Sequence, residues 1–255
     1  MNIDVIKNLL LETDDLFFNE KLRNSVKEKG EADFVTGADI RISEFMHDRL
    51  QNAFPDINFM SEESEHTLDV NTSCWILDPI DGTTNFIRGI NFCSVSIALW
   101  SGNEAKLGVI YNPYTKEMFW AEKGKGAYLN ENRIYCTDKR KLNECIGVYE
   151  YNAYYKDEVN QAIEYAKKIY LNCLDIRNFG SAALDMAYVA CGRADVFLGR
   201  YLKPWDYVAG TLIVSEAGGK VSKLDGDIDI TDFKSNIIAC TSAVRDEFAR
   251  VLLGE

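Results

Sequence analysis

Residues 75–86 read WILDPIDGTTNF, and this stretch carries more information about the chain than any other. The apolar run Trp75 to Leu77 predicts a buried strand, which delivers two carboxylates, Asp78 and Asp81, at its end. The proline between them fixes its own φ and restricts the residue before it, so the turn is stiff and the carboxylates can stay convergent. Mg²⁺ prefers carboxylate, carbonyl and water oxygens, usually together with the phosphate of a substrate. The stretch therefore predicts a divalent metal site at the end of the strand.

The residues that follow predict a phosphate site beside the metal. Gly82 lets the backbone approach a ligand closely, and the N–H groups of a helix that begins near Thr83 would point at an anion. The carbonyl of Ile80 adds a further oxygen for the metal. A plain strand with an Asp-Gly turn and a threonine N-cap would have the same local sequence, so this stretch alone leaves that alternative open.

Two distant segments place further carboxylates at the ends of predicted elements. Glu62 and Glu63 follow an apolar stretch, Ile57 to Met60. Because adjacent strand residues point to opposite faces, only one of the two can face a given metal, and we expect it to be Glu62. Asp206 lies in the first turn of a helix-like run that includes Val208 to Ala217. Taken alone, the glutamates also fit a solvated acidic loop, and Asp206 also fits a helix N-cap.

Taken together, these motifs resemble the inositol monophosphatase family of Mg²⁺-dependent, Li⁺-sensitive phosphatases. The segments that carry the resemblance are Glu62-Glu63, Asp78 to Thr84, Trp205-Asp206, Glu216 to Gly219, Asp33 to Thr36 with Asp39, and Gly180 to Ala183. The resemblance spans nearly the whole chain and implies an α/β fold of the inositol monophosphatase and fructose-1,6-bisphosphatase type, with α-β-α-β-α layers. It also implies a single domain over residues 1–255, strand-rich to about 145 and α/β from about 146, with a metal cleft between the halves.

The resemblance further implies a role for each matching residue. Its metal ligands would be Glu62, Asp78, the Ile80 carbonyl, Asp81 and Asp206. They would hold two Mg²⁺ ions with Asp78 as the bridge, and a third ion could lie near Glu63. The catalytic residues would be Asp39, Thr83 and Glu63, and the phosphate would be held by the N–H groups of Gly82 and Thr83. The substrate-binding residues would be Asp81, Arg177, Gly180, Ser181 and Ala182. The implied reaction is hydrolysis of a small phosphate monoester, such as inositol 1-phosphate, by metal-activated water in direct in-line attack, and the implied assembly is a homodimer.

The composition agrees with such an enzyme. The chain has 255 residues, of which 47% are hydrophobic, enough to bury a substantial core. Its formal net charge is −12 and no stripe of Lys and Arg stands out, which argues against a nucleic-acid-binding protein. An acidic protein that handles an anionic substrate needs local positive charge, and bound divalent metals would supply it.

Cysteine usage and hydropathy predict the compartment. Seven cysteines are scattered without a C-x-x-C pair, which favours neither a zinc site nor a disulfide framework. No stretch approaches the length of a membrane span, and the N-terminus lacks a basic region followed by an apolar core. We therefore expect a reduced, cytoplasmic protein with a small phosphorylated substrate and neither nucleic acid nor membrane as a partner.

Hydrophobic periodicity predicts helices in both halves and a run of strands in the first. The predicted helices cover residues 3–10, 40–50, 155–170, 182–190, 208–217 and 243–253. The predicted strands cover residues 57–60, 75–77, 92–100, 105–111, 117–121, 173–177, 194–198 and 236–241, and a further strand is expected just beyond Cys145. The glycines at 124 and 126 are expected to interrupt strands rather than to belong to one.

The chain departs from the family pattern at several positions. Seven residues before Asp206, where the family usually has an acidic side chain that grips sugar or inositol hydroxyls, the chain has Gly199. We therefore expect weak discrimination among small phosphate monoesters. Arg177 or Arg200 could contact a second phosphate, or each could be a surface or structural arginine. Two smaller departures are Ser61 in place of a glycine before the paired glutamates, and a displaced lysine for which Lys27 and Lys29 are candidates.

Competing functions remain open on the sequence alone. A fructose-1,6-bisphosphatase or a 3′(2′),5′-bisphosphate nucleotidase would use the same metal frame, and a histidinol-phosphate phosphatase is a further relative. Phosphatases with an aspartyl nucleophile have one residue between their aspartates, whereas two residues separate Asp78 from Asp81. A non-enzymatic regulatory binding protein would be expected to have lost ligands, and here all of them are present.

Overall fold

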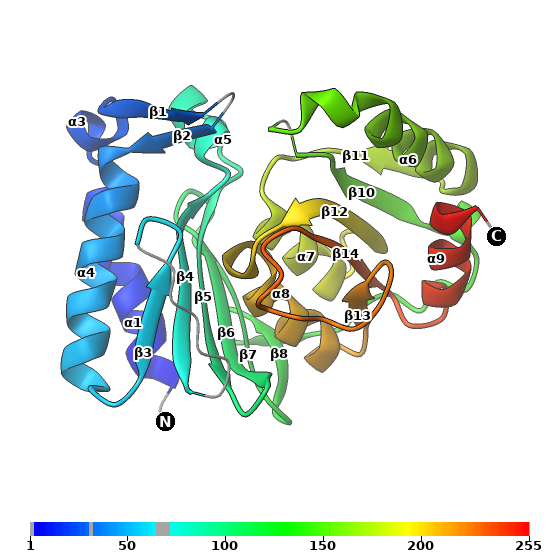
Figure 1. The fold of residues 1–255 in the computed structure, drawn as a ribbon. Helices are drawn as coiled ribbons and strands as arrows, with labels where there is room; N and C mark the ends of the chain where they lie inside the picture. The colour runs from blue at the N-terminus through cyan, green and yellow to red at the C-terminus, as the bar shows by residue number, and fades with distance from the viewer. Residues whose placement is uncertain (1–2, 31–32, 65–71, 153, 255) are drawn as a thin grey trace.

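The computed structural model describes residues 3–30, 33–64, 72–152 and 154–254. Its helices and sheets alternate in five layers, α-β-α-β-α, with the N-terminal helices on one outer face and the C-terminal helix on the other (Figure 1). The layered α/β fold that the resemblance implies is confirmed. In the described part of the chain, no helix combines the length and the apolar character needed to cross a bilayer.

The first half forms a seven-stranded sheet with the strands in chain order. The strands are β3 (Asn58–Ser61), β4 (Cys74–Asp81), β5 (Ser94–Ser101), β6 (Glu104–Asn112), β7 (Glu117–Glu122), β8 (Gly126–Leu129) and β9 (Asn132–Ile134). β3 and β4 are parallel, and every later pair is antiparallel. All eight residues of β4 are buried, as a central strand covered on both faces requires. The short strands β8 and β9 were not predicted: β8 begins at Gly126, which was expected to interrupt a strand, and β9 has only three residues.

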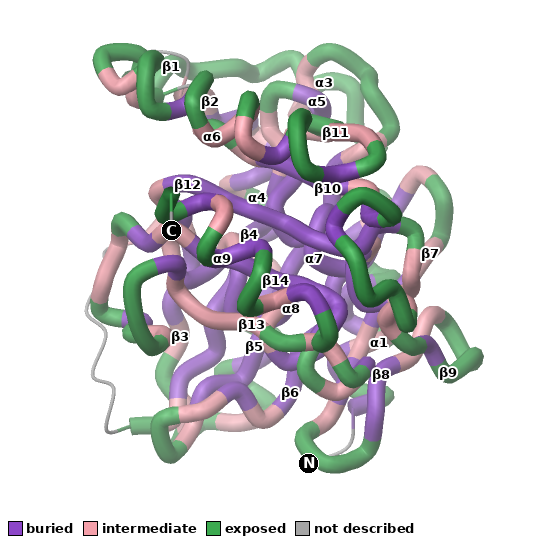
Figure 2. The backbone as a smooth tube through the Cα atoms, turned by 90° about the vertical axis from the view of Figure 1, so that its right-hand side faces the viewer, coloured by how far each residue is buried: buried purple, intermediate pink, exposed green. Residues whose placement is uncertain are grey.

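Helices α1 (Ile3–Glu12) and α4 (Gly37–Ala53) cover the outer face of this sheet. Between them, α2 (Asp14–Phe17) and α3 (Glu20–Arg23) lead from α1 to a small hairpin, which α4 follows directly. The hairpin pairs β1 (Val26–Gly30) with β2 (Asp33–Thr36), and β1 is exposed along its whole length (Figure 2). The sequence reading did not predict this hairpin.

The second half forms a five-stranded sheet in the order β11-β10-β12-β14-β13. Its strands are β10 (Ile146–Glu150), β11 (Asp175–Arg177), β12 (Val196–Leu202), β13 (Lys220–Lys223) and β14 (Ser235–Cys240). β10 is parallel to β11 and β12, whereas β14 is antiparallel to β12 and β13. Two short 3₁₀ helices, η1 (Leu142–Glu144) and η2 (Lys156–Glu158), flank β10, and α6 (Val159–Asn172) and α9 (Arg245–Leu253) cover the outer face. Strand β13 was not predicted.

Helices α7 (Ala182–Ala190) and α8 (Pro204–Glu216) form the middle layer between the two sheets. Both are apolar on nearly all sides, which is expected of helices buried between two sheets. Side chains of both helices share one hydrophobic core with residues of both sheets. α7 has the predicted bounds. α8 begins earlier than Val208 because Pro204 fits the first turn of a helix, where its missing N–H costs nothing.

α8 lies directly on the backbone of β6. A Cβ atom at Gly108 would lie 2.8 Å from the carbonyl oxygen of Ala209, so only glycine allows this approach. Gly210 similarly lets α8 approach Met186 of α7. These two contacts set the position of α8, which carries Asp206 at its start.

A single methyl group at Gly108 tests this contact. Because the backbone of β6 or α8 must shift to accept it, we expect Gly108→Ala to lower the free energy of unfolding by about 1–3 kcal/mol, measured in urea. Gly226→Ala is the matched control, since no heavy atom lies within 4 Å of a Cβ built there. Equal stability of the two variants would contradict the close packing, and one cooperative transition in the parent protein would support the predicted single domain.

Candidate active site

A cleft of about 590 Å³ opens where β4, β10 and β12 end and where α5 (Thr83–Arg88), α7 and α8 begin. The predicted site residues on its wall are Glu62, Asp78, Ile80, Asp81, Gly82, Thr83, Gly180, Ala182 and Asp206. A larger hollow of about 760 Å³ lies over α4, and of the predicted site residues it contacts only Glu63. The cleft, and not the larger hollow, is therefore the candidate active site.

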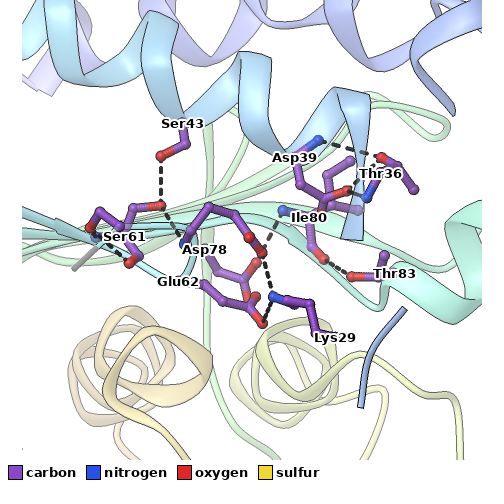
Figure 3. Close-up of polar contacts among 11 residues, drawn as sticks. Lys29, Thr36, Asp39, Ser43, Ser61, Glu62, Asp78, Ile80 and Thr83 are labelled. Atoms are coloured by element: carbon purple, nitrogen blue, oxygen red, sulfur yellow. Dashed lines mark hydrogen bonds and ion pairs between the residues drawn. The ribbon is translucent and has the colours of Figure 1, made fainter. Parts of the chain in front are cut away.

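The end of β4 is irregular at the predicted metal ligands. Asp78 pairs with Ser96 of β5 and Asp81 pairs with Ser94, so β4 has one extra residue between the two pairs. Such a bulge re-aims the side chains beside it, and it also accommodates the proline at position 79. The Ile80 N–H donates to Asp78 Oδ1 at 3.0 Å, and the Thr83 hydroxyl donates to the Ile80 carbonyl at 3.0 Å (Figure 3).

Asp81 joins β4 to the N-terminus of α7. Its Oδ2 accepts hydrogen bonds from the Ser181 hydroxyl and from the Ala183 N–H at 2.9 Å, and its Oδ1 accepts from the Ala182 N–H at 3.2 Å. A carboxylate at a helix N-terminus is stabilised both by these donors and by the helix dipole. Asp81 therefore links the two halves of the chain at the floor of the cleft.

Gly82 follows in the left-handed region, with φ of 88°. A Cβ atom there would lie 2.8 Å from the carbonyl oxygen of Gly180, so the chain needs glycine for its backbone angle and for the space. Asn85 of α5 strengthens the same junction, since its side chain donates to the Phe179 carbonyl at 2.6 Å.

Glu62 and Glu63 face different surroundings, as expected of neighbouring residues at a strand end. Glu62 lines the cleft and Glu63 lines the hollow over α4. Lys29 bridges them: its Nζ lies 3.3 Å from Glu62 Oε1 (Figure 3). The same Nζ lies 2.7 Å from Glu63 Oε1. Of the two candidates for the displaced lysine, Lys29 is therefore the one that contacts the paired glutamates. Burial alone would lower the pKa of Lys29, but the two glutamates outweigh it and raise that pKa.

The β2–α4 junction holds Asp39. Its Oδ2 accepts from the Thr36 N–H at 2.8 Å and from the Thr36 hydroxyl at 2.5 Å, and the Thr36 hydroxyl in turn caps α4 by accepting from the Ala38 N–H at 3.1 Å. This capping box explains why α4 begins at Gly37 rather than at Ile40. Asp39 Oδ1 is buried and has no hydrogen-bond partner among the described residues.

Asp206 reaches the cleft from the first turn of α8, where its Oδ2 accepts from the Lys203 N–H at 2.8 Å. The alternative of a helix N-cap is wrong in detail, because the N-cap is Lys203 and Asp206 is the third residue of α8, from which its side chain accepts the N-cap N–H. The same side chain also lines the cleft. The two roles are compatible because a carboxylate has two oxygens, each with more than one acceptor position.

Burial dominates the electrostatics of the site. It raises the pKa of Asp39 to about 7 and that of Asp81 to about 6, although hydrogen bonds from Thr36 and Ser181 oppose the rise. Burial, and next to it the charge of Glu62, raises the pKa of Asp78 and of Asp206 well above the usual range. Several buried carboxyl groups thus lie close together, and the positively charged side chains nearby do not balance their negative charge.

A hard divalent cation fits this deficit, because it would supply the missing positive charge to oxygen ligands. Among the described residues, however, no three His, Cys, Asp or Glu side chains are already gathered around one point for a metal. Like charges repel one another, and Lys29 draws Glu62 toward Glu63. The donor set therefore fits Mg²⁺ in its chemistry, and binding would draw the side chains together.

The remaining predicted residues lie in different places. Gly180 and Ala182 line the cleft, whereas Ser181 is buried and holds Asp81. Arg177 is not brought to the cleft: it is exposed on β11 and pairs with Asp175 at 2.5 Å. Arg200 is buried beside α6, where it contacts Glu158 at 3.0 Å. Neither arginine lies on the cleft wall.

Ser61 is accommodated without strain in place of the family's glycine. Its hydroxyl accepts from the Ser43 hydroxyl of α4 at 2.8 Å (Figure 3).

At position 199, where the resemblance led us to expect an acidic side chain facing the substrate, the structure leaves no room for a larger side chain. A Cβ atom on Gly199 would lie 2.4 Å from Leu202 Cδ1 and 2.7 Å from Phe197 Cζ. A bulge between Gly199 and Leu202 turns the Leu202 side chain back over this position. An acidic side chain at 199 therefore does not fit unless Leu202 moves.

Part of the cleft wall was missed by the sequence reading. The missed residues include Glu150, Tyr151, Asn152, Tyr154, Asn178 and Tyr201. Glu150 ends β10 and Tyr201 lies near the end of β12, whereas the others lie in the segments that follow β10 or precede α7. These positions could have been expected in advance, because α/β sheets bind ligands at the carboxyl ends of their parallel strands.

Comparison with known proteins places the chain among phosphatases. The model of the inositol monophosphatase family matches residues 2–252. An inositol-1-monophosphatase of Caulobacter vibrioides is 40% identical over 222 residues, covering 86% of this chain and 87% of the relative. A fructose-1,6-bisphosphatase/inositol-1-monophosphatase of Thermotoga maritima is 37% identical over 232 residues, covering 91% and 87%. The solved structure of the extragenic suppressor protein suhB of Bartonella henselae is similar with a TM-score of 0.90 and 36% identity, covering 98% of this chain and 97% of that one.

The raised pKa values predict how pH affects the metal-free protein. Asp39 and Asp81 have pKa values of about 7 and about 6 in the folded state, above the ordinary value of 3.8, so between about pH 4 and 7 the folded state binds more protons than the unfolded state. Stability should then fall as pH rises through this window. We expect a lower melting temperature at pH 8 than at pH 6 in EDTA, and a larger stabilisation by Mg²⁺ at pH 8. A metal-free protein that melts at the same or a higher temperature at pH 8 would contradict this reading of the cluster.

Proposed function

The chain belongs to the inositol monophosphatase family, and we propose that it is a Mg²⁺-dependent phosphatase that hydrolyses a small phosphate monoester. The observation that carries the proposal is the gathering of Glu62, Asp78, Asp81 and Asp206 on one cleft. Glu62 directly follows β3, and Asp78 and Asp81 belong to β4. Asp206 lies in the first turn of α8. The fold therefore brings together residues that are far apart in the sequence.

We propose that Glu62, Asp78, the Ile80 carbonyl, Asp81 and Asp206 hold Mg²⁺. Two ions with Asp78 between them are what the resemblance implies, and a third near Glu63 would compete with Lys29 for the same oxygens. Bound Mg²⁺ would supply the positive charge that a phosphate ester needs and would make water a better nucleophile at neutral pH.

Asp39 is proposed as the general base. Thr36 fixes one of its oxygens, and the other, Oδ1, has no partner among the described residues and can take a proton from water. The Thr83 hydroxyl donates to the Ile80 carbonyl, which leaves its own oxygen to accept a hydrogen bond from the same water. Water attacks phosphorus in line as Asp39 takes one of its protons, the P–O bond to the alcohol breaks, and the departing alkoxide takes a proton from solvent water. Asp39 then returns its proton to solvent. Glu63 supports this arrangement through Lys29 rather than by contact with the cleft.

The phosphate would be held by the N–H groups of Gly82 and Thr83, and the alcohol portion by Asp81, Gly180 and Ala182. Ser181 contributes by holding Asp81 in place. Inositol 1-phosphate is the first substrate to try. Fructose 1,6-bisphosphate is the second candidate, because one relative is named for both activities. Among the described residues the cleft wall has no arginine, and its one lysine, Lys203, lies at the start of α8 beside Asp206, which supports a monophosphate as the substrate.

The homodimer, the cytoplasmic location and inhibition by Li⁺ are retained as proposals. The homodimer has support in exposed apolar side chains on and after α6, namely Ile163, Tyr170, Leu171 and Leu174. Their exposure would be reduced by a second copy.

Replacing Asp78 by Asn tests the metal frame. Because Asp78 would serve two ions, loss of its charge should weaken both sites and abolish Mg²⁺-dependent hydrolysis, while calorimetry should show loss of Mg²⁺ binding. Asp246→Asn, at an exposed position on α9, is the matched control and should leave both unchanged.

The assay uses inositol 1-phosphate, fructose 1,6-bisphosphate, adenosine 3′,5′-bisphosphate and NADP⁺ with Mg²⁺. Hydrolysis of none of them by the parent protein would overturn the phosphatase proposal, and near-normal turnover by Asp78→Asn at saturating Mg²⁺ would remove Asp78 from the ligand set.

Asp39→Asn separates proton transfer from metal binding. Asn can still accept from Thr36 but is a far weaker base, so kcat should fall by about 10²- to 10⁴-fold while the calorimetric Mg²⁺ affinity stays near that of the parent. An unchanged kcat would exclude Asp39 as the base, and a parallel loss of Mg²⁺ affinity would show that it acts through the metals.

A further inference from the structure

Glu150 lies beside the position where the resemblance expects an acidic side chain. β10 and β12 are parallel neighbours, and Glu150 pairs in register with Gly199. Paired residues on adjacent strands point to the same face of the sheet, with the strands about 4.8 Å apart. The carboxyl group that is missing from β12 is therefore present one strand away on β10.

Position 199 itself cannot easily supply that group. Leu202 and Phe197 occupy the space that a side chain on Gly199 would need. Glu150 has no such obstruction on its cleft side, since it lines the cleft together with Asn178 and Tyr201. This wall of the cleft thus has an acidic side chain at Glu150, whereas apolar atoms fill the space beside Gly199.

The hydrogen bonds of Glu150 leave it short of partners. Its Oε1 accepts a long hydrogen bond from the Asn152 N–H, at 3.4 Å. Its Oε2 has no hydrogen-bond partner among the described residues. Buried polar atoms are nearly always partnered, so a buried carboxylate oxygen without a partner indicates a ligand group that completes it.

The neighbours of Glu150 limit which group that can be. The Asn178 side-chain amide donates to the Tyr149 carbonyl at 2.6 Å, and it lies close enough to Glu150 to oppose the rise that burial causes in the pKa of Glu150. Burial, and after it the charge of Glu150, raises the pKa of Asp185 on α7 well above the usual range, and Asp185 is not among the residues that line the cleft. A second anion would be repelled here, whereas a hydroxyl group can donate to the carboxylate.

We propose that Glu150 determines specificity by accepting hydrogen bonds from hydroxyl groups of the substrate's alcohol portion. The proposal rests on the proposed phosphatase function and names its substrate class, polyol monophosphates. Hydrogen bonds to a carboxylate are about twice as strong as neutral ones, and a site built on them rejects analogues that lack the hydroxyl. The earlier expectation of weak discrimination, which followed from Gly199 alone, is replaced by selectivity for polyols.

The test compares inositol 1-phosphate with 4-nitrophenyl phosphate, whose leaving group has no further hydroxyl. The ratio of the two kcat/KM values measures recognition of the alcohol portion independently of the metal chemistry. Glu150→Gln keeps the size and the acceptor for Asn152 but removes the charge, and should lower the ratio about tenfold. Glu150→Ala removes the contact and should lower it about 100-fold, with the loss mainly in KM for inositol 1-phosphate.

Glu164→Gln, an exposed glutamate on α6, is the matched control. Melting temperatures of all variants, measured with Mg²⁺, show whether each variant folds. If Glu150→Ala does not fold, the ratio is compared for Glu150→Gln alone. A fall of both substrates by the same factor would mean that Glu150 only supports the fold or Asp81, and an unchanged ratio would mean that hydroxyl recognition lies elsewhere. Both results would overturn the proposal.

Failure of the proposed phosphatase function would give a different result in the same assay. If the parent protein hydrolyses neither ester with Mg²⁺, the phosphatase proposal fails. If it hydrolyses 4-nitrophenyl phosphate but no polyol phosphate, the phosphatase proposal stands and the role of Glu150 is overturned.

Discussion

The contact between Asp81 and the N-terminus of α7 is the interaction on which the rest of the site depends. One carboxylate at the end of β4 receives the Ser181 hydroxyl and two backbone N–H groups from a segment 100 residues further along the chain. The helix dipole favours a negative charge there. Close approach of Gly82 to the Gly180 carbonyl reinforces the same junction. With this junction made, the ends of β4, β10 and β12 face one cleft.

The second constraint is charge. The cleft gathers more buried carboxylates than the nearby Lys29 and Lys203 can balance. Burial, and after it the charge of Glu62, therefore raises the pKa of Asp78 and of Asp206. Such an arrangement costs stability in the absence of a cation, and costs of this kind are typical of functional sites. The fold tolerates it because the middle layer is otherwise apolar and tightly packed, down to the contact of Gly108 with the backbone of α8.

The sequence predicted what depends on local pattern. The apolar strand before Asp78, the bounds of α7, and the expectation that Glu62 and Glu63 face different surroundings follow from periodicity and from the alternation of side chains along a strand. It missed the short β1–β2 hairpin and strands β8, β9 and β13, whose few residues carry too little pattern.

What depends on neighbouring strands could not be read from one strand at a time. Counting back from Asp206 led to Gly199 but could not show that Leu202 folds over it, nor that Glu150 is its partner in the sheet. Arg177 preceded the Gly180 loop in sequence yet lies on the edge strand β11, where it pairs with Asp175. Register and bulges, rather than composition, decide these positions.

The central claim is that the carboxylates on this cleft exist to hold divalent metal. Anomalous diffraction from crystals grown with Mn²⁺ in place of Mg²⁺ tests it most directly, because Mn²⁺ accepts the same oxygen ligands and is located without reference to activity. The account predicts anomalous peaks within coordination distance of Asp78, one of them shared with Glu62 and another with Asp206. A saturated crystal with no peak in the cleft, or with peaks only on the outer surface, would contradict it.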